Sequence, residues 1–495
     1  MSSHLGDPAT SALLLSSLEG KSVPVTSDHD YHEIRWADKN GVHNMSTEKQ
    51  LSLWIRFGQP LEPVIENYQQ VFDGWQAGGV KVIVVGRLLF SHSDGRPMTV
   101  ATFDPNPSIY RDMGVEPPNG PEEKQPKKRD LFRKTLEEAK ARGLKVFVFC
   151  PDSGQGPGGN GHPLADDISL AARVARIRDV MEAYPMVDGG VLDGPELGYE
   201  ITPGHRSNIF EDTPETLRDV ATDLDFDFDA MIAARDRFHD KLHNLNPSEI
   251  DLRADGGFLG GFELFDSDRD LTAWFAFRRD LLMQYYRRQH EAFTQFSRPV
   301  QIGVGSRLPC FTPLNGYDLK VMAELYDFIL PKLYFFHRGF NGFYGTIGRY
   351  IQTLTDWNPE LSDAHAMKVI ESLFGVRLPW VQSRFDLELG FPPEFFESIV
   401  QGETRRMLAA TSSAEQVVPW VEAGREPHRG DPIIPGDLYR YLTAAQKVGL
   451  EHFLYHSHTH LSQSEWAVIT NLCGEPWFDG KPGYTPPDGV AWESQ

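Results

Sequence analysis

Cysteine is scarce in this sequence. Only Cys150, Cys310 and Cys473 occur among 495 residues, and no two of them form a CxxC spacing. A disulfide framework or a cysteine zinc site needs closely spaced cysteines, so this distribution predicts reduced thiols in the core. The cysteines therefore do not support a disulfide-stapled protein.

Runs of basic residues are missing too. The chain has 48 Lys and Arg residues against 70 Asp and Glu residues, which gives a formal net charge of −22 at pH 7. A protein that binds nucleic acid neutralises phosphates with clustered Lys and Arg side chains. We therefore expect no nucleic acid partner, and we attribute the acidic surface to solubility.

Long hydrophobic runs are also absent. Residues 1–20 contain a short apolar patch with no basic region before it, and no other run approaches membrane-spanning length. The sequence therefore predicts neither a signal peptide nor a membrane anchor, and we expect a cytoplasmic protein without a membrane partner. It leaves the oligomeric state open.

Two common catalytic motifs are missing. The glycine-rich segment 151–163 lacks the Lys-Ser/Thr pair and the helix start of a phosphate-binding P-loop, and no serine lies in a nucleophile elbow. Nucleotide-dependent and Ser/His/Asp chemistry are therefore not expected, and neither is a cofactor. We expect segment 151–163 to form a flexible lid.

A regular alternation of short strands and amphipathic helices dominates the rest of the sequence. Such βα units predict a parallel sheet, and eight in succession favour a closed (β/α)8 TIM barrel over an open doubly wound sheet. A distorted barrel of seven strands is the alternative. The predicted strands are 51–57, 81–90, 145–150, 187–193, 300–308, 326–336, 416–424 and 451–458. The predicted helices are 61–77, 128–143, 166–184, 268–296, 317–325, 392–410, 436–450 and 463–472.

The domain boundaries follow from this pattern. We predict an N-terminal extension at 1–50, a catalytic barrel at 51–473 and a C-terminal tail at 474–495, without a linker that divides the chain. Long insertions follow four of the strands, on the face where barrel enzymes carry their active sites. These insertions are 91–127, 151–165, 194–267 and 337–391.

Polar side chains stand where the predicted strands end. A barrel is filled by apolar layers, so charged residues at one of its mouths indicate a site rather than packing. Apart from the three acids Asp193, Glu196 and Glu422, we predict that these side chains bind substrate. They are Arg56, Arg87, Asp152, Arg307, Lys332, Tyr334, Arg425, His456 and His458.

Two of the acids suit a specific reaction. Glu196 follows the fourth strand and Glu422 lies on the seventh, on opposite sides of the predicted mouth. Hydrolysis of a glycosidic bond needs one protonated carboxyl that assists the leaving group and one ionised carboxylate that acts as nucleophile or base. We therefore predict a glycoside hydrolase with a carbohydrate substrate.

The segments "DGPELGYE" at 193–200 and "PWVEAGR" at 419–425 carry a family resemblance. By strand order, residues 50–473 resemble the superfamily of (β/α)8-barrel glycoside hydrolases, whose retaining members place an acid/base glutamate after strand four and a nucleophile glutamate after strand seven. The resemblance implies Glu196 as the acid/base and Glu422 as the nucleophile.

Asp193 remains an alternative acid/base. Pro195 stands where the retaining members usually have Asn, directly before Glu196. The run "DGGVLDGPE" at 188–196 is also similar to strand-four signatures of chitinase-like and uncharacterised glycosidase groups, although its spacing differs from the chitinase one. The choice between Asp193 and Glu196 stays open at the sequence level.

Other interpretations of the charged residues at the predicted strand ends also stay open. Helix capping or ion pairing explains the acids without any chemistry. The arginines either orient the carboxylates or bind an anionic group such as a uronic acid or a sulfate, and ion pairing within the ring explains them without such a group.

A metal-dependent hydrolase or isomerase is the second functional hypothesis. His456, His458 and His460 alternate, so they would share one face of a continued strand and could hold a metal ion. A turn that begins after His456 is the simpler interpretation, and we expect no metal. A barrel that binds carbohydrate without catalysis is the third hypothesis.

Overall fold

Eight parallel strands form one sheet in the order β8-β7-β6-β5-β2-β1-β10-β9. The structure is a computed structural model that describes residues 50–58, 60–94, 100–121, 123–151, 162–205, 207–335, 342–421 and 434–487. Parallel bridges join Ile329 to Val417 and Lys332 to Trp420, and the Val418 amide donates to the Ile329 carbonyl at 2.9 Å. These contacts bring β9 against β8 and close the sheet, which confirms the predicted (β/α)8 barrel.

Each predicted strand segment overlaps one strand of the barrel. The strands are β1 Ser52–Phe57, β2 Val80–Val85, β5 Lys145–Pro151, β6 Gly189–Asp193, β7 Gln301–Ser306, β8 Phe328–Pro331, β9 Trp420–Val421 and β10 His452–Tyr455.

The predicted second strand, 81–90, is too long. The barrel strand ends at Val85, and β3 (Leu89–Phe90) instead pairs antiparallel with β4 (Val100–Ala101). The chain leaves the barrel at Gly86, where a Cβ atom would lie 3.0 Å from the Gly58 Cα. The approach needs glycine at Gly58, where φ is +152° and an added Cβ atom would lie 2.7 Å from the Gly86 Cα.

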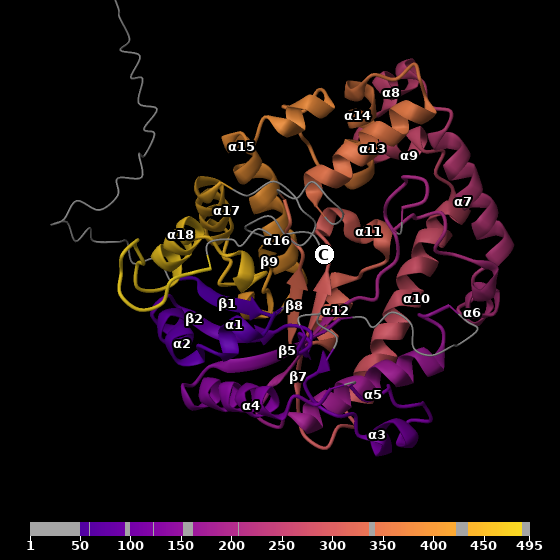
Figure 1. Cartoon of the computed structure of the whole chain (residues 1–495). Coiled ribbons are helices and arrows are strands. Elements are labelled where there is room, and N and C mark those ends of the chain that lie inside the picture. The colour runs from indigo at the N-terminus through magenta and orange to yellow at the C-terminus, as the bar shows by residue number, and fades with distance from the viewer. Residues whose placement is uncertain are drawn as a thin grey trace, which may run out of the picture. The chain divides into compact units, whose positions relative to one another are not determined.

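Helices follow the strands and surround the barrel, as Figure 1 shows for α2, α4, α5 and α10. The helices that match predicted ones are α1 Glu62–Ile65, α2 Tyr68–Ala77, α4 Pro126–Ala141, α5 Asp167–Ala183, α10 Arg269–Phe293, α12 Leu319–Leu325, α15 Pro393–Phe395, α16 Gln401–Ala410, α17 Pro435–Lys447 and α18 Gln463–Cys473. Between α15 and α16 lies a π-helical turn, Phe396–Val400.

Local sequence explains where these helices begin and end. The Asp166 side chain accepts a hydrogen bond from the Ser169 amide at the start of α5, and Asp268 caps α10 in the same way. Gly143 and Gly449 have φ values of +79° and +104° between a helix and the next strand. Left-handed glycines of this kind end a helix and let the strand begin at once.

The insertions after β6 and β8 are largely helical, which the sequence pattern did not predict. Their helices are α6 Arg218–Asp223, α7 Phe228–Leu242, α8 Pro247–Arg253, α9 Gly257–Leu264, α13 Phe343–Trp357 and α14 Asp363–Phe374, with 3₁₀ turns at 215–217 and 384–388. Shorter elements elsewhere are α3 Pro107–Asp112, α11 Thr312–Asn315 and the 3₁₀ turns at 309–311, 414–416 and 458–460. Asn358 joins the two insertions because its amide group bonds to the backbone of Leu242 and Leu245. The insertions therefore form one wall around the C-terminal mouth.

Side chains alternate between the inside and the outside of the barrel along each strand. The inward cluster consists of Trp54, Val82, Val84, Phe147, Phe149, Val191, Leu330, Tyr334, Val418, Trp420 and Leu454. Neighbouring positions such as Leu53 and Ile55 belong instead to the large core between barrel and helices. With this period of two, Arg56 on β1 and Asp193 on β6 face inward, one layer above Trp54 and Val191.

Residues 474–487 are the described part of the predicted tail. Trp477 and Tyr484 are buried, and the Glu475 amide donates to the Ala77 carbonyl at 2.7 Å. The tail therefore packs against the end of α2 as part of the barrel unit. None of the helices within the described residues is long and apolar enough to cross a membrane.

Candidate active site

The inward positions at the carboxyl ends of the strands gather most of the predicted site residues. Asp193 ends β6, and Arg307 and Lys332 follow β7 and β8 by one residue each. His456 follows β10 and lies with its ring 5.9 Å from Tyr334 and 5.4 Å from Trp420. Carboxyl ends of parallel strands meet at one mouth of a barrel, so these side chains share one surface.

Asp193 forms an ion pair with Lys332. The Lys332 ammonium nitrogen lies 2.5 Å from a carboxylate oxygen of Asp193, whose side chain is 34% exposed. Burial alone would raise the pKa of Asp193, but the pairing with Lys332 and the charges of Arg307 and Arg56 outweigh it and leave the pKa below its ordinary value. Asp193 is therefore an ionised carboxylate at neutral pH.

Glu196 forms a two-point ion pair with Arg307. The Arg307 Nε donates to Oε2 at 2.6 Å, and a second guanidinium nitrogen contacts Oε1. Arg307 is only 1% exposed, and although burial lowers its pKa, the Glu196 carboxylate raises that pKa above the ordinary value. Bidentate pairs of this kind fix orientation, so the Glu196 side chain is held in place.

Hydrogen bonds anchor the loop that carries Glu196. The peptide bond between Gly194 and Pro195 is cis, and the hydroxyls of Tyr286 and Tyr317 donate to the Pro195 carbonyl at 2.7 and 3.2 Å. The chain from Asp193 to Glu196 is thus fixed by groups from outside the loop. This rigidity suits residues that must hold a defined geometry.

Glu200 anchors the same loop to α13. Its carboxylate is completely buried, pairs with Arg349 at 2.6 Å and accepts a hydrogen bond from the Thr346 hydroxyl at 3.1 Å. The Tyr350 hydroxyl also donates to the Tyr199 carbonyl. The insertion after β8 therefore supports the loop after β6.

Asp212 is a carboxyl near the site that sequence analysis missed. Burial raises its pKa, nearby Arg278 lowers it, and the negative charge of Glu196 raises it further, with a net upward shift. Its Oδ2 accepts a hydrogen bond from the Gly198 amide. No strand end or motif precedes Asp212, so only the folded loop reveals its closeness to Glu196.

Arg56 lies inward at the end of β1. It is 8% exposed, and its guanidinium carbon stands 4.6 Å from the ring centre of Phe149 and 6.0 Å from that of Trp420. Its Nε is buried without a hydrogen-bond partner. Burial lowers the pKa of Arg56 to about 10, although Tyr334 and Asp193 oppose this shift.

The predicted histidines occupy different surroundings. His456 lies at the mouth, whereas the His458 Nε2 is 2.7 Å from the Tyr484 hydroxyl and its ring stands edge-on to Trp75. The chain turns into a 3₁₀ helix at His458–His460, so the histidines do not alternate along a continued strand. Among the described residues, no group of three or more His, Cys, Asp or Glu side chains is arranged to hold a metal ion.

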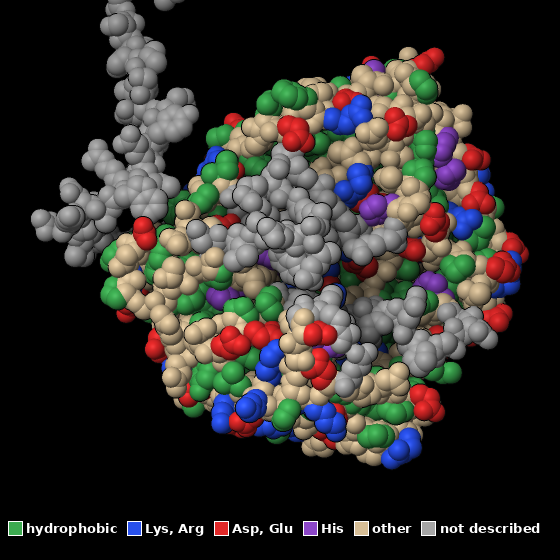
Figure 2. All heavy atoms as spheres, viewed as in Figure 1, with side chains coloured by type: hydrophobic (Ala, Val, Ile, Leu, Met, Phe, Trp, Pro, Cys, Tyr) green, Lys and Arg blue, Asp and Glu red, His purple; other side chains and the backbone are tan. Residues whose placement is uncertain are grey.

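The remaining predicted site residues are less informative. Arg87 is exposed and follows Gly86 after β2. Asp152, Glu422 and Arg425 lie outside the described residues, as does most of the predicted lid at 151–163. On the face in Figure 2, Lys and Arg side chains are interspersed with Asp and Glu and form no continuous basic surface among the coloured residues.

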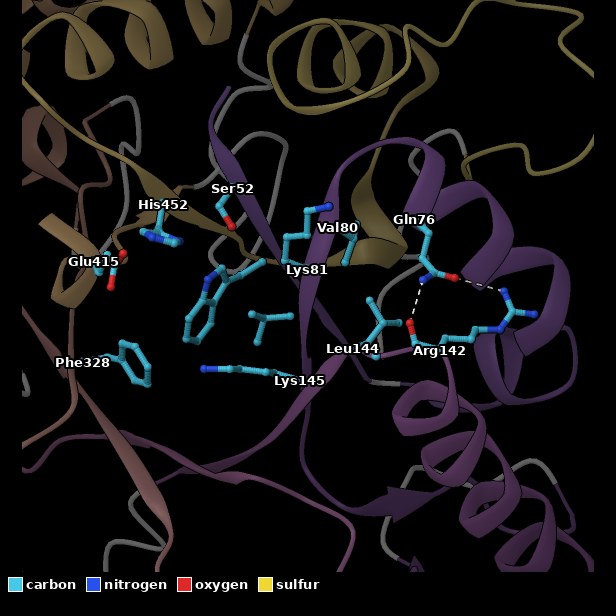
Figure 3. A pocket seen from close by; sticks show the side chains of 13 residues that line it. Ser52, Gln76, Val80, Lys81, Arg142, Leu144, Lys145, Phe328, Glu415 and His452 are labelled. Atoms are coloured by element: carbon cyan, nitrogen blue, oxygen red, sulfur yellow. Dashed lines mark hydrogen bonds between the residues drawn. The ribbon is translucent and has the colours of Figure 1, made fainter. Parts of the chain in front are cut away.

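A pocket of about 460 Å³ opens at the other end of the barrel, where the strands begin. Figure 3 shows Lys145 reaching toward Phe328, and Gln76 exchanging hydrogen bonds with Arg142. The lining residues are Ser52, Trp54, Gln76, Val80, Lys81, Val82, Arg142, Gly143, Leu144, Lys145, Phe328, Glu415 and His452. None of the predicted site residues belongs to this pocket, and the amino-terminal face of such barrels serves stability.

The fold and the charged mouth define a (β/α)8 barrel with the layout of an active site. No protein-family model matches the chain, and no curated protein is similar to it in sequence.

Solved structures with similar architecture include three glycan-cleaving enzymes. The PgaB (BpsB) glycoside hydrolase domain from Bordetella bronchiseptica is 12% identical, with 85% of this chain and 99% of that one covered and a TM-score of 0.40. A chitinase from Chromobacterium violaceum is 9% identical, with 85% and 98% covered and a TM-score of 0.36. A beta-galactosidase from Marinomonas ef1 is 10% identical, with 86% and 59% covered and a TM-score of 0.43. Similarity at this level does not define the activity of this chain.

Proposed function

We propose that this chain is a glycoside hydrolase whose reaction takes place at the C-terminal mouth of the barrel. The observation that carries the proposal is Asp193, a carboxylate that faces the inside of the barrel and is held ionised by Lys332 at 2.5 Å. An oxocarbenium-like transition state develops positive charge on the sugar, and a fixed carboxylate stabilises that charge or attacks the carbon that bears it.

The charge state of Asp193 suggests its role. A general acid must hold a proton at the working pH, and a pKa below the ordinary value disfavours this for Asp193. We therefore assign Asp193 the part of nucleophile or charge-stabilising carboxylate. The acid/base part falls to Glu196 or Glu422, and Glu196 must first exchange one of its two contacts with Arg307 for a contact with substrate.

Aromatic side chains lie at the base of the mouth. Tyr334, Trp420 and Phe149 belong to the buried inward cluster of the barrel, and Tyr334 and Trp420 contact His456. Aromatic faces stack on the apolar faces of sugar rings, and the neighbouring cations and His456 bond to hydroxyls. These groups support a carbohydrate as the substrate, and the proposed mechanism uses no cofactor.

Hydrolysis of a panel of aryl α- and β-glycosides, including uronides, tests the proposal. We expect turnover of at least one glycoside by the wild-type chain. We expect losses of at least about 100-fold in kcat for Glu196→Gln or Glu422→Gln, the scale typical of general acid/base groups. Turnover must persist in EDTA.

Three outcomes would contradict the proposal. Activity that EDTA abolishes would move the chemistry to a metal. Full activity in both glutamine variants would remove those two acids from the mechanism. Sugar binding without turnover of any glycoside would make the chain a carbohydrate-binding barrel.

A further inference from the structure

Arg56 differs from the other inward cations of the mouth. Lys332 is paired with Asp193, and Arg307 is paired with Glu196. Arg56 has no ion-pair contact with any carboxylate of a described residue, and its buried Nε has no hydrogen-bond partner. Burial of an unpaired charge destabilises the fold, so proteins keep such groups where function needs them.

The surroundings of Arg56 hold the guanidinium in place without neutralising it. The rings of Phe149 and Trp420 lie 4.6 and 6.0 Å from its central carbon, which are distances of cation–π contact. Gly86 lies beside it, and even a Cβ added there would stay 3.5 Å from a terminal nitrogen of Arg56. One edge of the guanidinium thus faces a residue without a side chain.

The local charge also favours an anion. Asp193 attracts Arg56 electrostatically, but the ion pair that Asp193 forms is with Lys332. Arg87 adds a further positive charge near Arg56. Asp193 and Glu196 are already paired, so among the described residues of the mouth the unmatched charges are those of Arg56 and Arg87, which are positive.

We propose that the substrate of this mouth carries an oxyanion group, a carboxylate or a sulfate, that pairs with Arg56. This inference rests on the proposed glycoside hydrolase function and names its substrate class as uronic acid or sulfated sugars. Phe149 and Trp420, whose ring centres lie 5.7 Å apart, both contact the guanidinium, and this planar group presents two parallel N–H groups that match the two oxygens of either anion.

Binding of simple sugars by isothermal titration calorimetry tests the proposal directly. The probes are D-glucuronate, D-galacturonate and glucose 6-sulfate, each compared with methyl glucoside as the neutral sugar. We expect at least one anionic sugar to bind the wild-type chain at least about 10-fold more tightly than the neutral sugar. Arg56→Gln should weaken this binding about 10- to 100-fold, the range for a hydrogen bond to a charged group, and Arg56→Lys should weaken it less.

The matched control is Lys145→Met, which removes a cation from the pocket at the opposite end of the barrel. We expect it to bind the anionic sugars like the wild type. Circular dichroism and thermal melting of each variant establish that it is folded, and Arg56→Lys keeps the test valid if the glutamine variant does not fold. Comparison of the affinities for the two uronates with the affinity for glucose 6-sulfate shows whether the site prefers a carboxylate or a sulfate.

The results that would overturn the proposal are distinct from a failure of the glycosidase activity. Equal binding of neutral and anionic sugars, binding unchanged in Arg56→Gln, or binding lost in Lys145→Met would each overturn the oxyanion site. Hydrolysis of each uronide and of the matching neutral glycoside is measured in parallel. Arg56→Gln should lower the ratio of kcat/KM for the uronide to kcat/KM for the neutral glycoside at least about 10-fold. Anion binding through Arg56 without any hydrolysis would leave the site standing and reject the glycosidase.

Discussion

Lys332 sets the charge of Asp193 at the scale of single residues. Burial raises the pKa of this carboxyl, and only the neighbouring cations, with Lys332 foremost, bring it below the ordinary value. The balance of these opposing effects decides whether Asp193 is an acid or an anion at neutral pH.

Lys332→Met removes the main cation beside Asp193. Burial then dominates, so we expect the pKa of Asp193 to rise and the acid limb of the kcat/KM profile to move to higher pH by at least about one unit. The proposed mechanism needs Asp193 ionised, so we expect the activity of the wild-type chain to fall only at pH values below the ordinary range of aspartate. Profiles of both chains between pH 3 and 8 measure the shift, and an unchanged acid limb would contradict the role given to Asp193.

The buried charge of Arg56 is expected to lower the free energy of unfolding. Arg56→Met keeps much of the side-chain volume that packs against Phe149 and Trp420 and removes an unpaired buried charge. We expect the free energy of unfolding to rise by about 1–2 kcal/mol in urea titrations, because an apolar replacement of buried charge is neutral or stabilising. A loss of stability would show that Arg56 has a structural role that the present contacts do not reveal.

At the scale of elements, α13 supports the loop after β6 through one buried ion pair. Arg349→Met leaves the completely buried Glu200 carboxylate with Thr346 as its remaining side-chain partner. We expect a loss of about 2–4 kcal/mol in the free energy of unfolding, and recovery of at least half of it when Glu200→Leu is added.

An exposed ion pair is the control for this prediction. The Asp167 partner of Arg288 is 88% exposed, so Arg288→Met should change the unfolding free energy by less than about 1 kcal/mol. Equal effects of the Arg288 and Arg349 variants would show that the Glu200 pair is not a special support of the loop.

The docking of the tail on the barrel is expected to depend on pH. Burial lowers the pKa of His458 to about 3, and its Nε2 contacts the Tyr484 hydroxyl. Unfolded chains protonate histidine below about pH 6.5, so stability falls as the pH decreases from there toward the folded pKa, by up to about 1.4 kcal/mol per pH unit for one proton.

His458→Gln removes this proton-linked term. We expect its free energy of unfolding to depend less steeply on pH between 6.5 and 4 than that of the wild type. Urea titrations at several pH values measure the two slopes, and identical slopes would mean that His458 is not buried as a neutral ring.

At the scale of the whole molecule, the sequence pattern predicts the barrel well. Each of the eight predicted segments overlaps a strand, because inward and outward apolar positions and helix ends leave periodic traces in the sequence. The strand pattern also predicted Arg56, Asp193, Arg307 and Lys332 at one mouth, because the carboxyl ends of parallel strands lie at the same end of a barrel.

What the sequence could not predict depends on contacts between distant segments. Which cation pairs with which acid is decided by the loop after β6, and so is the closeness of Asp212 to Glu196. The strand ends at Tyr455 and a 3₁₀ helix spans His458–His460, which agrees with the simpler interpretation of a turn after His456 and not with histidines that alternate along one strand. Glu422, the predicted nucleophile, remains a prediction.

The central claim is that Asp193 carries the reaction at the C-terminal mouth. The most direct test compares kcat/KM of Asp193→Asn and Asp188→Asn on the best aryl glycoside. Asp188 lies just before the same strand, at the opposite end of the barrel, and pairs with Lys140 at 2.7 Å. Asp188→Asn is therefore a matched control, because it also removes one carboxylate from an ion pair. We predict a loss of at least about 100-fold for Asp193→Asn and less than about threefold for Asp188→Asn. Comparable activity in the two variants would contradict the assignment of the active site to this mouth.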